Sequence, residues 1–261
     1  MQRRHLLIAA AAAPLGARAQ VSDLADAINK AGRQRMLSQR MGKAWLALVH
    51  QAEGRNASAV LDKSMALFDR QLAELKAFAP SPDIRGTYTA LEAAWSDYQG
   101  ALVGTAPSKA GAAAVLKADA RVLALAHQGT VQYEAAMGRP VGKLVNVAGR
   151  QRMLSQRMAK FYYAATLPVD SATAVAEIGK ARSEFLAAMT TLRDAPEATA
   201  RIRDELVLAD GQWFFFDQAL QRVQSGAAAA TAKPLSDVFV TSENLLSVMD
   251  RVTGLYANVK S

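Results

Sequence analysis

The segment that decides the fold is Asn29–Lys43, with the sequence NKAGRQRMLSQRMGK, because the chain contains it twice. The second copy, NVAGRQRMLSQRMAK, occupies residues 146–160 and is identical at thirteen of fifteen positions. Repetition at a fixed offset indicates duplicated structural units, so we expect a tandem repeat of a unit of about 117 residues. Weaker matches outside the two boxes keep nearly the same offset: Phe68 with Phe185, Leu75 with Leu192, Trp95 with Trp213, and Ala101-Leu102 with Ala219-Leu220.

The residues around each box predict helices separated by short breaks. Runs rich in Ala, Leu, Gln and Arg favour helix, and Gly and Pro mark the breaks. The predicted helices are 21–52, 57–78, 84–103 and 108–137 in the first unit, and 142–166, 171–193, 197–224 and 235–259 in the second. Short connections predict an all-α fold of two tandem antiparallel four-helix bundles, residues 20–138 and 139–261. Alternatively, the fourth helix runs on into the second box helix with a kink at Pro140.

The first 19 residues have the features of an export signal. Two arginines, Arg3 and Arg4, precede a short apolar stretch, and Ala17-Arg18-Ala19 fits the small-x-small cleavage pattern. We therefore expect cleavage after Ala19 and a periplasmic protein, with either the general secretory or the twin-arginine route open. No later stretch is long and apolar enough to predict a membrane helix.

Composition excludes several classes of function. The chain has no cysteine and only three histidines, which excludes disulfides, thiolate metal sites and an imidazole-based zinc site. It has no Glu-x-x-His pair, nucleophile elbow or phosphate loop, so we expect neither an enzyme nor a cofactor. Removing the signal, which carries three arginines and no acidic residue, lowers the net charge from +8 to +5. So mild an excess favours a solvated basic surface over nucleic-acid binding.

Each box helix carries two stripes of side chains. Leu37, Met41 and Trp45 lie on the face expected to pack inside the helix's own bundle. A mixed polar and apolar stripe lies on a different face, because residues three and four apart stack along a helix. It contains Gly32, Arg35, Met36 and Gln39 in the first copy, and Gly149, Arg152, Met153 and Gln156 in the second. A helix with two stripes is expected to contact two partners, so these eight residues are the candidate ligand site.

The second stripe combines residues that suit a compact anion. A glycine inside a helix costs about 1 kcal/mol relative to alanine, which a close approach by a helix or ligand would explain. Arginine offers a planar fork of donors that matches planar oxyanions. If the boxes pack about a pseudo-two-fold axis, Arg35 and Arg152 face each other, and a bound anion would offset their repulsion. The competing interpretation is a solvated basic face. The flanking arginines are read as surface or inter-helix salt-bridge residues: Arg33, Arg40, Arg150 and Arg157.

The box resembles two families of sensor domain. Its pattern N-x-A-G-R-Q-R-M-L-S-Q-R-M resembles the signature of the N-terminal domain of type IV pili methyl-accepting chemotaxis transducers (PilJ-like). It is also similar to the P-box of nitrate/nitrite sensor histidine kinases (NarX-like). In those sensors a periplasmic four-helix bundle holds the anion between two box helices, with an arginine from each and backbone near the glycine. The resemblance implies these roles for Arg35, Arg152, Gly32 and Gly149.

These observations predict a periplasmic module that binds or senses a small oxyanion, with nitrate or nitrite favoured. Related sensors continue into membrane helices and signalling modules, which do not follow the second unit here, so a separate membrane-bound signalling or transport partner is expected. The alternative is a structural or protein-interaction bundle without a small ligand. Whether the boxes pair within one chain or in a homodimer is left open.

Overall fold

The computed structural model describes residues 20–167, 171–224 and 232–259. The predicted export signal, the break at 168–170 and most of the break at 225–233 lie outside these ranges. The described residues form eight α-helices and no strand, as the sequence predicts. They are α1 (Leu24–Val49), α2 (Gly54–Phe78), α3 (Pro82–Val103), α4 (Ala112–Met137), α5 (Pro140–Ala165), α6 (Ser171–Asp194), α7 (Ala200–Gln224) and α8 (Ala232–Ala257).

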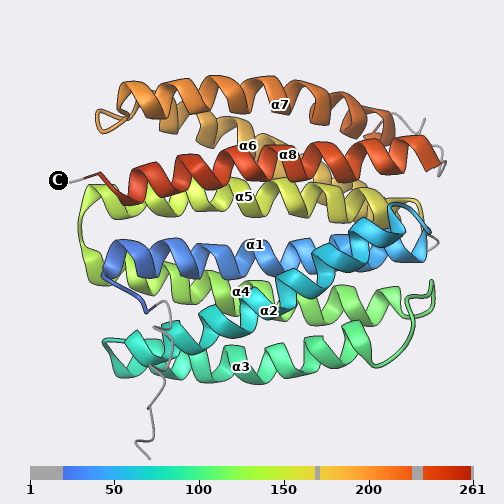
Figure 1. The fold of residues 1–261 in the computed structure, drawn as a ribbon, viewed down its shortest axis with the longest axis horizontal. Coiled ribbons are helices and arrows are strands. Elements are labelled where there is room, and N and C mark those ends of the chain that lie inside the picture. The colour runs from blue at the N-terminus through green and yellow to red at the C-terminus, as the bar shows by residue number, and fades with distance from the viewer. Residues whose placement is uncertain (1–19, 168–170, 225–231, 260–261) are drawn as a thin grey trace, which may run out of the picture.

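The helix ends follow local chemistry. The carboxylate of Asp23 caps α1 by accepting a hydrogen bond of 2.8 Å from the backbone N–H of Asp26. Gly138, with φ of 63°, ends α4, and Pro140 begins α5. The chain reverses direction there (Figure 1), so the alternative of one continuous kinked helix is wrong.

Most predicted helix boundaries differ from the structure by one to four residues, and two of these differences have a clear physical cause. The first helix ends at Val49 rather than at residue 52, because Gln51 and Glu53 adopt left-handed conformations with φ of 56° and 53°. Such turns usually contain glycine, so the sequence gives no signal for this one. The last helix starts at Ala232 rather than at 235, since a helix tolerates Pro234 in its first turn.

The helices form two tandem bundles joined through their box helices. Helices α1 and α5 lie side by side in the middle and run in the same direction, with α2–α4 on one side and α6–α8 on the other (Figure 1). Helix α1 packs against α2, α4 and α5, while α5 packs against α1, α6 and α8. This arrangement confirms the predicted fold class. None of the described helices combines the length and apolar character required to cross a membrane.

The weaker sequence echoes occupy equivalent places in the two bundles. The rings of Phe68 and Trp95 have centroids 4.3 Å apart, and those of Phe185 and Trp213 lie 4.5 Å apart. In the same way, Tyr133 donates its hydroxyl to the carbonyl of Leu75, and Tyr256 donates to that of Leu192. The duplication is therefore preserved in packing as well as in sequence.

Candidate functional site

The two boxes meet in register along the contact between α1 and α5, which we call the seam. The Nη2 of Arg35 donates to the backbone carbonyl of Asn146 at 3.3 Å and to its side-chain Oδ1 at 2.7 Å. In the opposite direction, Nη2 of Arg152 donates to the carbonyl of Asn29 at 3.0 Å. Because Asn29 and Asn146 are equivalent positions of the repeat, the seam has pseudo-two-fold symmetry within one chain.

The two guanidinium groups converge on the two box glycines. A Cβ added at Gly32 would lie 3.2 Å from Nη2 of Arg35 and 3.5 Å from Nη2 of Arg152. At Gly149 the corresponding distances are 3.1 Å to Arg152 and 3.8 Å to Arg35. The two nitrogens are therefore no farther apart than the sum of two such contacts. This explains the glycines: each leaves room for the terminal nitrogens of both arginines.

Both arginines are fully buried, so the solvated basic face is wrong for them. Burial, together with the charges of Arg150 and Arg152, lowers the pKa of Arg35 to about 9. Burial also lowers the pKa of Arg152, but Asp250 opposes the shift and the value is about 10. The Nε of each arginine has no hydrogen-bond partner. The seam thus holds two cations in a setting that disfavours charge.

The two arginines differ in their counterion. Nη1 of Arg152 forms an ion pair with Oδ1 of Asp250 at 2.5 Å, whereas Nη1 of Arg35 meets Nδ1 of His127 at 3.2 Å. Burial, followed by the charge of Arg35, lowers the pKa of His127 below its usual value. Because a guanidinium group can only donate, Nδ1 of His127 is the acceptor in this contact, as in a neutral imidazole. Within the described ranges, no carboxylate forms an ion pair with Arg35. Arg152 therefore has a carboxylate in direct contact, whereas Arg35 is linked to Glu134 only through the side chain of Asn146.

The other predicted site residues are buried but lie in different places. Nε2 of Gln39 donates to Asp119 on α4, and Nε2 of Gln156 donates to the carbonyl of Ser242 on α8. Met36 packs in the core, and Met153 borders a cavity between α4, α5 and α6. The structure therefore brings four of the eight predicted residues together around the two guanidinium groups: Gly32, Arg35, Gly149 and Arg152.

The flanking arginines form inter-helix salt bridges, which is one of the two roles predicted for them; the other was a surface position. On α1, Arg33 pairs with Asp250 and Arg40 pairs with Glu243, so both reach across the seam to α8. The equivalent arginines of α5 stay within their own bundle and pair with α6: Arg150 with Glu184, and Arg157 with Glu177. The two units therefore use the same arginines with different carboxylates.

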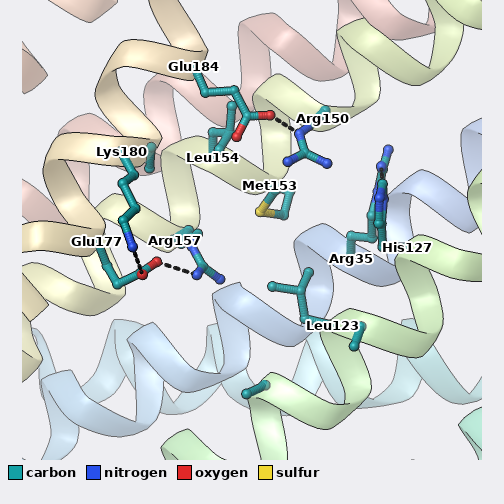
Figure 2. A pocket seen from close by; sticks show the side chains of 13 residues that line it. Arg35, Leu123, His127, Arg150, Met153, Leu154, Arg157, Glu177, Lys180 and Glu184 are labelled. Carbon is teal, nitrogen blue, oxygen red and sulfur yellow. Dashed lines mark hydrogen bonds and ion pairs between the residues drawn. The ribbon is translucent and has the colours of Figure 1, made fainter. Parts of the chain in front are cut away.

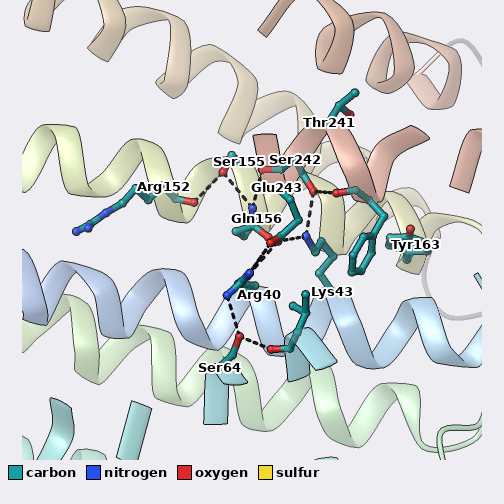
Figure 3. A network of polar contacts seen from close by, with 12 residues as sticks. Arg40, Lys43, Ser64, Arg152, Ser155, Gln156, Tyr163, Thr241, Ser242 and Glu243 are labelled. Atoms are coloured by element: carbon teal, nitrogen blue, oxygen red, sulfur yellow. Dashed lines mark hydrogen bonds and ion pairs between the residues drawn. The ribbon is translucent and has the colours of Figure 1, made fainter. Parts of the chain in front are cut away.

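Two buried lysines also cross the seam, in opposite directions. Nζ of Lys43 on α1 donates to Oγ of Ser242 at 3.0 Å and to Glu243 at 2.6 Å on α8 (Figure 3). Nζ of Lys160 on α5 pairs with Asp119 on α4. The sequence does not predict these pairs, because the acidic partners lie outside the repeated box.

These ion pairs predict a loss of stability in acid. Burial alone would raise the pKa of Asp250, but Arg152 and Arg33 outweigh it and lower the value to about 2. The pKa of Glu243 is also about 2, because Lys43 and Arg40 outweigh the effect of burial. Both values lie below those of an unfolded chain, so the pairs stabilise at neutral pH and are lost as the pH falls from about 5 to about 2.

Urea unfolding measured at several pH values should therefore show a declining midpoint over this range. The Asp250→Asn variant should start from a lower stability and decline less steeply. An identical pH profile for the variant and the wild-type protein would contradict the assignment.

The comparisons with known proteins agree with this architecture. No curated protein and no solved structure matches the chain. A family model does match, over residues 17–128 and 135–239, and the two matched segments each contain one box. The family consists of sensory domains of signalling proteins rather than of catalytic domains. The chain belongs to the family described as type IV pili methyl-accepting chemotaxis transducer N-terminal domains (PilJ).

Proposed function

We propose that this protein is a periplasmic sensor or binding module for a small oxyanion of the nitrate or nitrite type, and that the anion binds at the seam. The observation that supports this most directly is the convergence of two buried guanidinium groups on Gly32 and Gly149. Membership of a family of chemotaxis sensory domains supports the sensing role. The resemblance of the box to the P-box of nitrate/nitrite sensor kinases supports the choice of anion.

The electrostatics of the seam favour an anionic guest. Two unit charges about 7 Å apart at an effective dielectric of about 20 repel by about 2 kcal/mol. An anion between Arg35 and Arg152 would replace that repulsion with charge-assisted hydrogen bonds, and a planar oxyanion matches the guanidinium fork. The chemistry therefore favours nitrate over a spherical anion of equal charge.

Anion binding at the seam would be coupled to the contact between the two bundles. The arginines now donate to the carbonyls of Asn146 and Asn29, and a bound anion would take over these donors. The anion would then favour a different fit of α1 against α5. Such differential affinity for two arrangements is what a sensor requires. A separate membrane-bound signalling or transport partner would read out the change.

Nitrate and nitrite titrations followed by calorimetry and by thermal unfolding test the proposal. Ligand at 100 times its dissociation constant is expected to stabilise the fold by about 2.7 kcal/mol. The Arg35→Lys and Arg152→Lys variants keep the charge but lose the fork, so each should lose most of this response. The matched control Arg201→Lys, at an exposed position of α7, should respond like the wild-type protein.

If nitrate, nitrite, sulfate and phosphate all leave the unfolding temperature unchanged, the proposal is wrong. If the two seam variants lower stability but leave every anion response intact, the role of the box is only structural, namely to hold the two bundles together.

A further inference from the structure

A cavity of about 400 Å³ lies between α4, α5 and α6, on the side of the seam that carries His127. Figure 2 shows its lining side chains. One end is formed by Arg35, His127 and Arg150, and the wall carries Leu123, Met153 and Leu154. We call it the α4–α6 cavity. Its volume lies within the range typical of sites for small organic ligands and is far larger than a nitrate ion requires.

The pseudo-symmetry explains why the cavity reaches a seam arginine. The tyrosines that donate to Leu75 and Leu192 show that Tyr133 of α4 corresponds to Tyr256 of α8. The same offset relates His127 to Asp250 and Ala120 to Glu243. Helix α4 therefore has a neutral ring and a methyl group where α8 has two carboxylates.

The corresponding cleft of the other half is bordered by Arg40 and Glu243, between α8, α1 and α2. It does not reach Arg152, which is bound to Asp250. Of the two equivalent positions, 250 on α8 therefore carries an acidic side chain beside its seam arginine, and 127 on α4 does not.

The charges of the cavity point to a single anionic group at its inner end. Arg35 is fully buried, its Nε has no hydrogen-bond partner, and its neighbour His127 is a neutral ring. The other cations of the cavity are paired with carboxylates: Arg150 binds Glu184, and Arg157 and Lys180 both bind Glu177. A ligand with one negative charge would therefore be held beside Arg35, since the charge of Arg150 is already balanced by Glu184.

We propose that the α4–α6 cavity binds an organic monocarboxylate whose apolar body lies against Leu123, Met153 and Leu154 and whose carboxylate is held by Arg35. A carboxylate is planar and accepts two parallel hydrogen bonds from a guanidinium group. The apolar wall would bury the hydrocarbon part. This inference goes beyond the proposed function, because it needs neither Arg152 nor the glycines and involves a second class of ligand.

Calorimetric titration of the full chain with hexanoate tests the inference. Hexanoate is expected to bind, with affinity falling about fourfold for each methylene removed down the series to acetate. Ala124→Phe should abolish hexanoate binding, because Ala124 is an exposed residue of α4 that lines the cavity and phenylalanine would fill it. The matched control is Ala114→Phe, which places the same ring at an exposed position of α4 away from the cavity.

The outcomes separate this inference from the seam proposal. Arg152→Lys should reduce the nitrate response and leave hexanoate affinity within about twofold of wild type. Absence of hexanoate binding overturns the inference even if nitrate binds. Equal affinities for acetate and hexanoate, or hexanoate binding that survives Ala124→Phe, also overturn it. Hexanoate binding without any nitrate response would overturn only the seam proposal.

Discussion

Replacing Asp119 with alanine is expected to lower the free energy of unfolding by about 3–5 kcal/mol, which is the loss typical of breaking a buried ion pair. Asp119 is fully buried on α4, where it pairs with Lys160 and accepts a hydrogen bond of 2.6 Å from Nε2 of Gln39. Lys160 is only 2% exposed, and burial already lowers its pKa. Without the carboxylate, the core would contain an ammonium group that has lost its counterion.

Urea unfolding of purified variants would measure this loss. The matched control is Asp97→Ala, which removes an aspartate from an exposed pair with Arg121 and should change the stability by less than about 1 kcal/mol. The double variant Asp119→Leu/Lys160→Met should recover much of the loss, because apolar side chains can replace a buried pair with little cost. A single-variant loss no larger than that of the control would show that the pair does not hold the bundles together.

This prediction depends on a residue that sequence reasoning did not identify. The duplicated box predicts the helices and the two stripes, because these follow from the 3.6-residue period and from repetition. That Arg35 meets Arg152 follows only if the two boxes pack about a pseudo-two-fold axis, which the sequence leaves open. The partners of the box do not follow from the period or from repetition. Asp119 and Glu243 lie in segments where the two units no longer share residues, and only the packing brings them to Lys160 and Lys43.

The different partners of Arg35 and Arg152 could not be predicted from the sequence for a similar reason. The boxes repeat at an offset of 117 residues, whereas the fourth helices, matched through Tyr133 and Tyr256, repeat at an offset of 123. The second unit therefore has six additional residues between its box and its fourth helix. His127 and Asp250 are therefore not aligned by the repeat that defines the boxes. Their equivalence becomes visible only when the contacts of Arg35 and Arg152 are compared. Local patterns predict an element and its buried faces, whereas counterions depend on long-range packing.

Replacing His127 with aspartate is expected to weaken the binding of a carboxylate ligand in the α4–α6 cavity. An aspartate at the corresponding position 250 reaches Nη1 of Arg152 at 2.5 Å, so by pseudo-symmetry the new carboxylate should reach Arg35. It would occupy the donors that a bound carboxylate needs and would bring a like charge beside the ligand. A charge-assisted hydrogen bond contributes about 1.5–3 kcal/mol, so hexanoate affinity should fall by about 10- to 100-fold.

The conservative variant His127→Asn separates charge from shape. Asparagine is close in size to aspartate but neutral, so it leaves Arg35 without a counterion and should keep hexanoate affinity within a few-fold of wild type. The aspartate variant should also unfold at a higher temperature than the asparagine variant, since it neutralises a buried cation. If both variants lose binding equally, the imidazole itself contacts the ligand. If neither loses it, Arg35 does not hold the carboxylate, and the different counterions of the two seam arginines have no bearing on ligand binding.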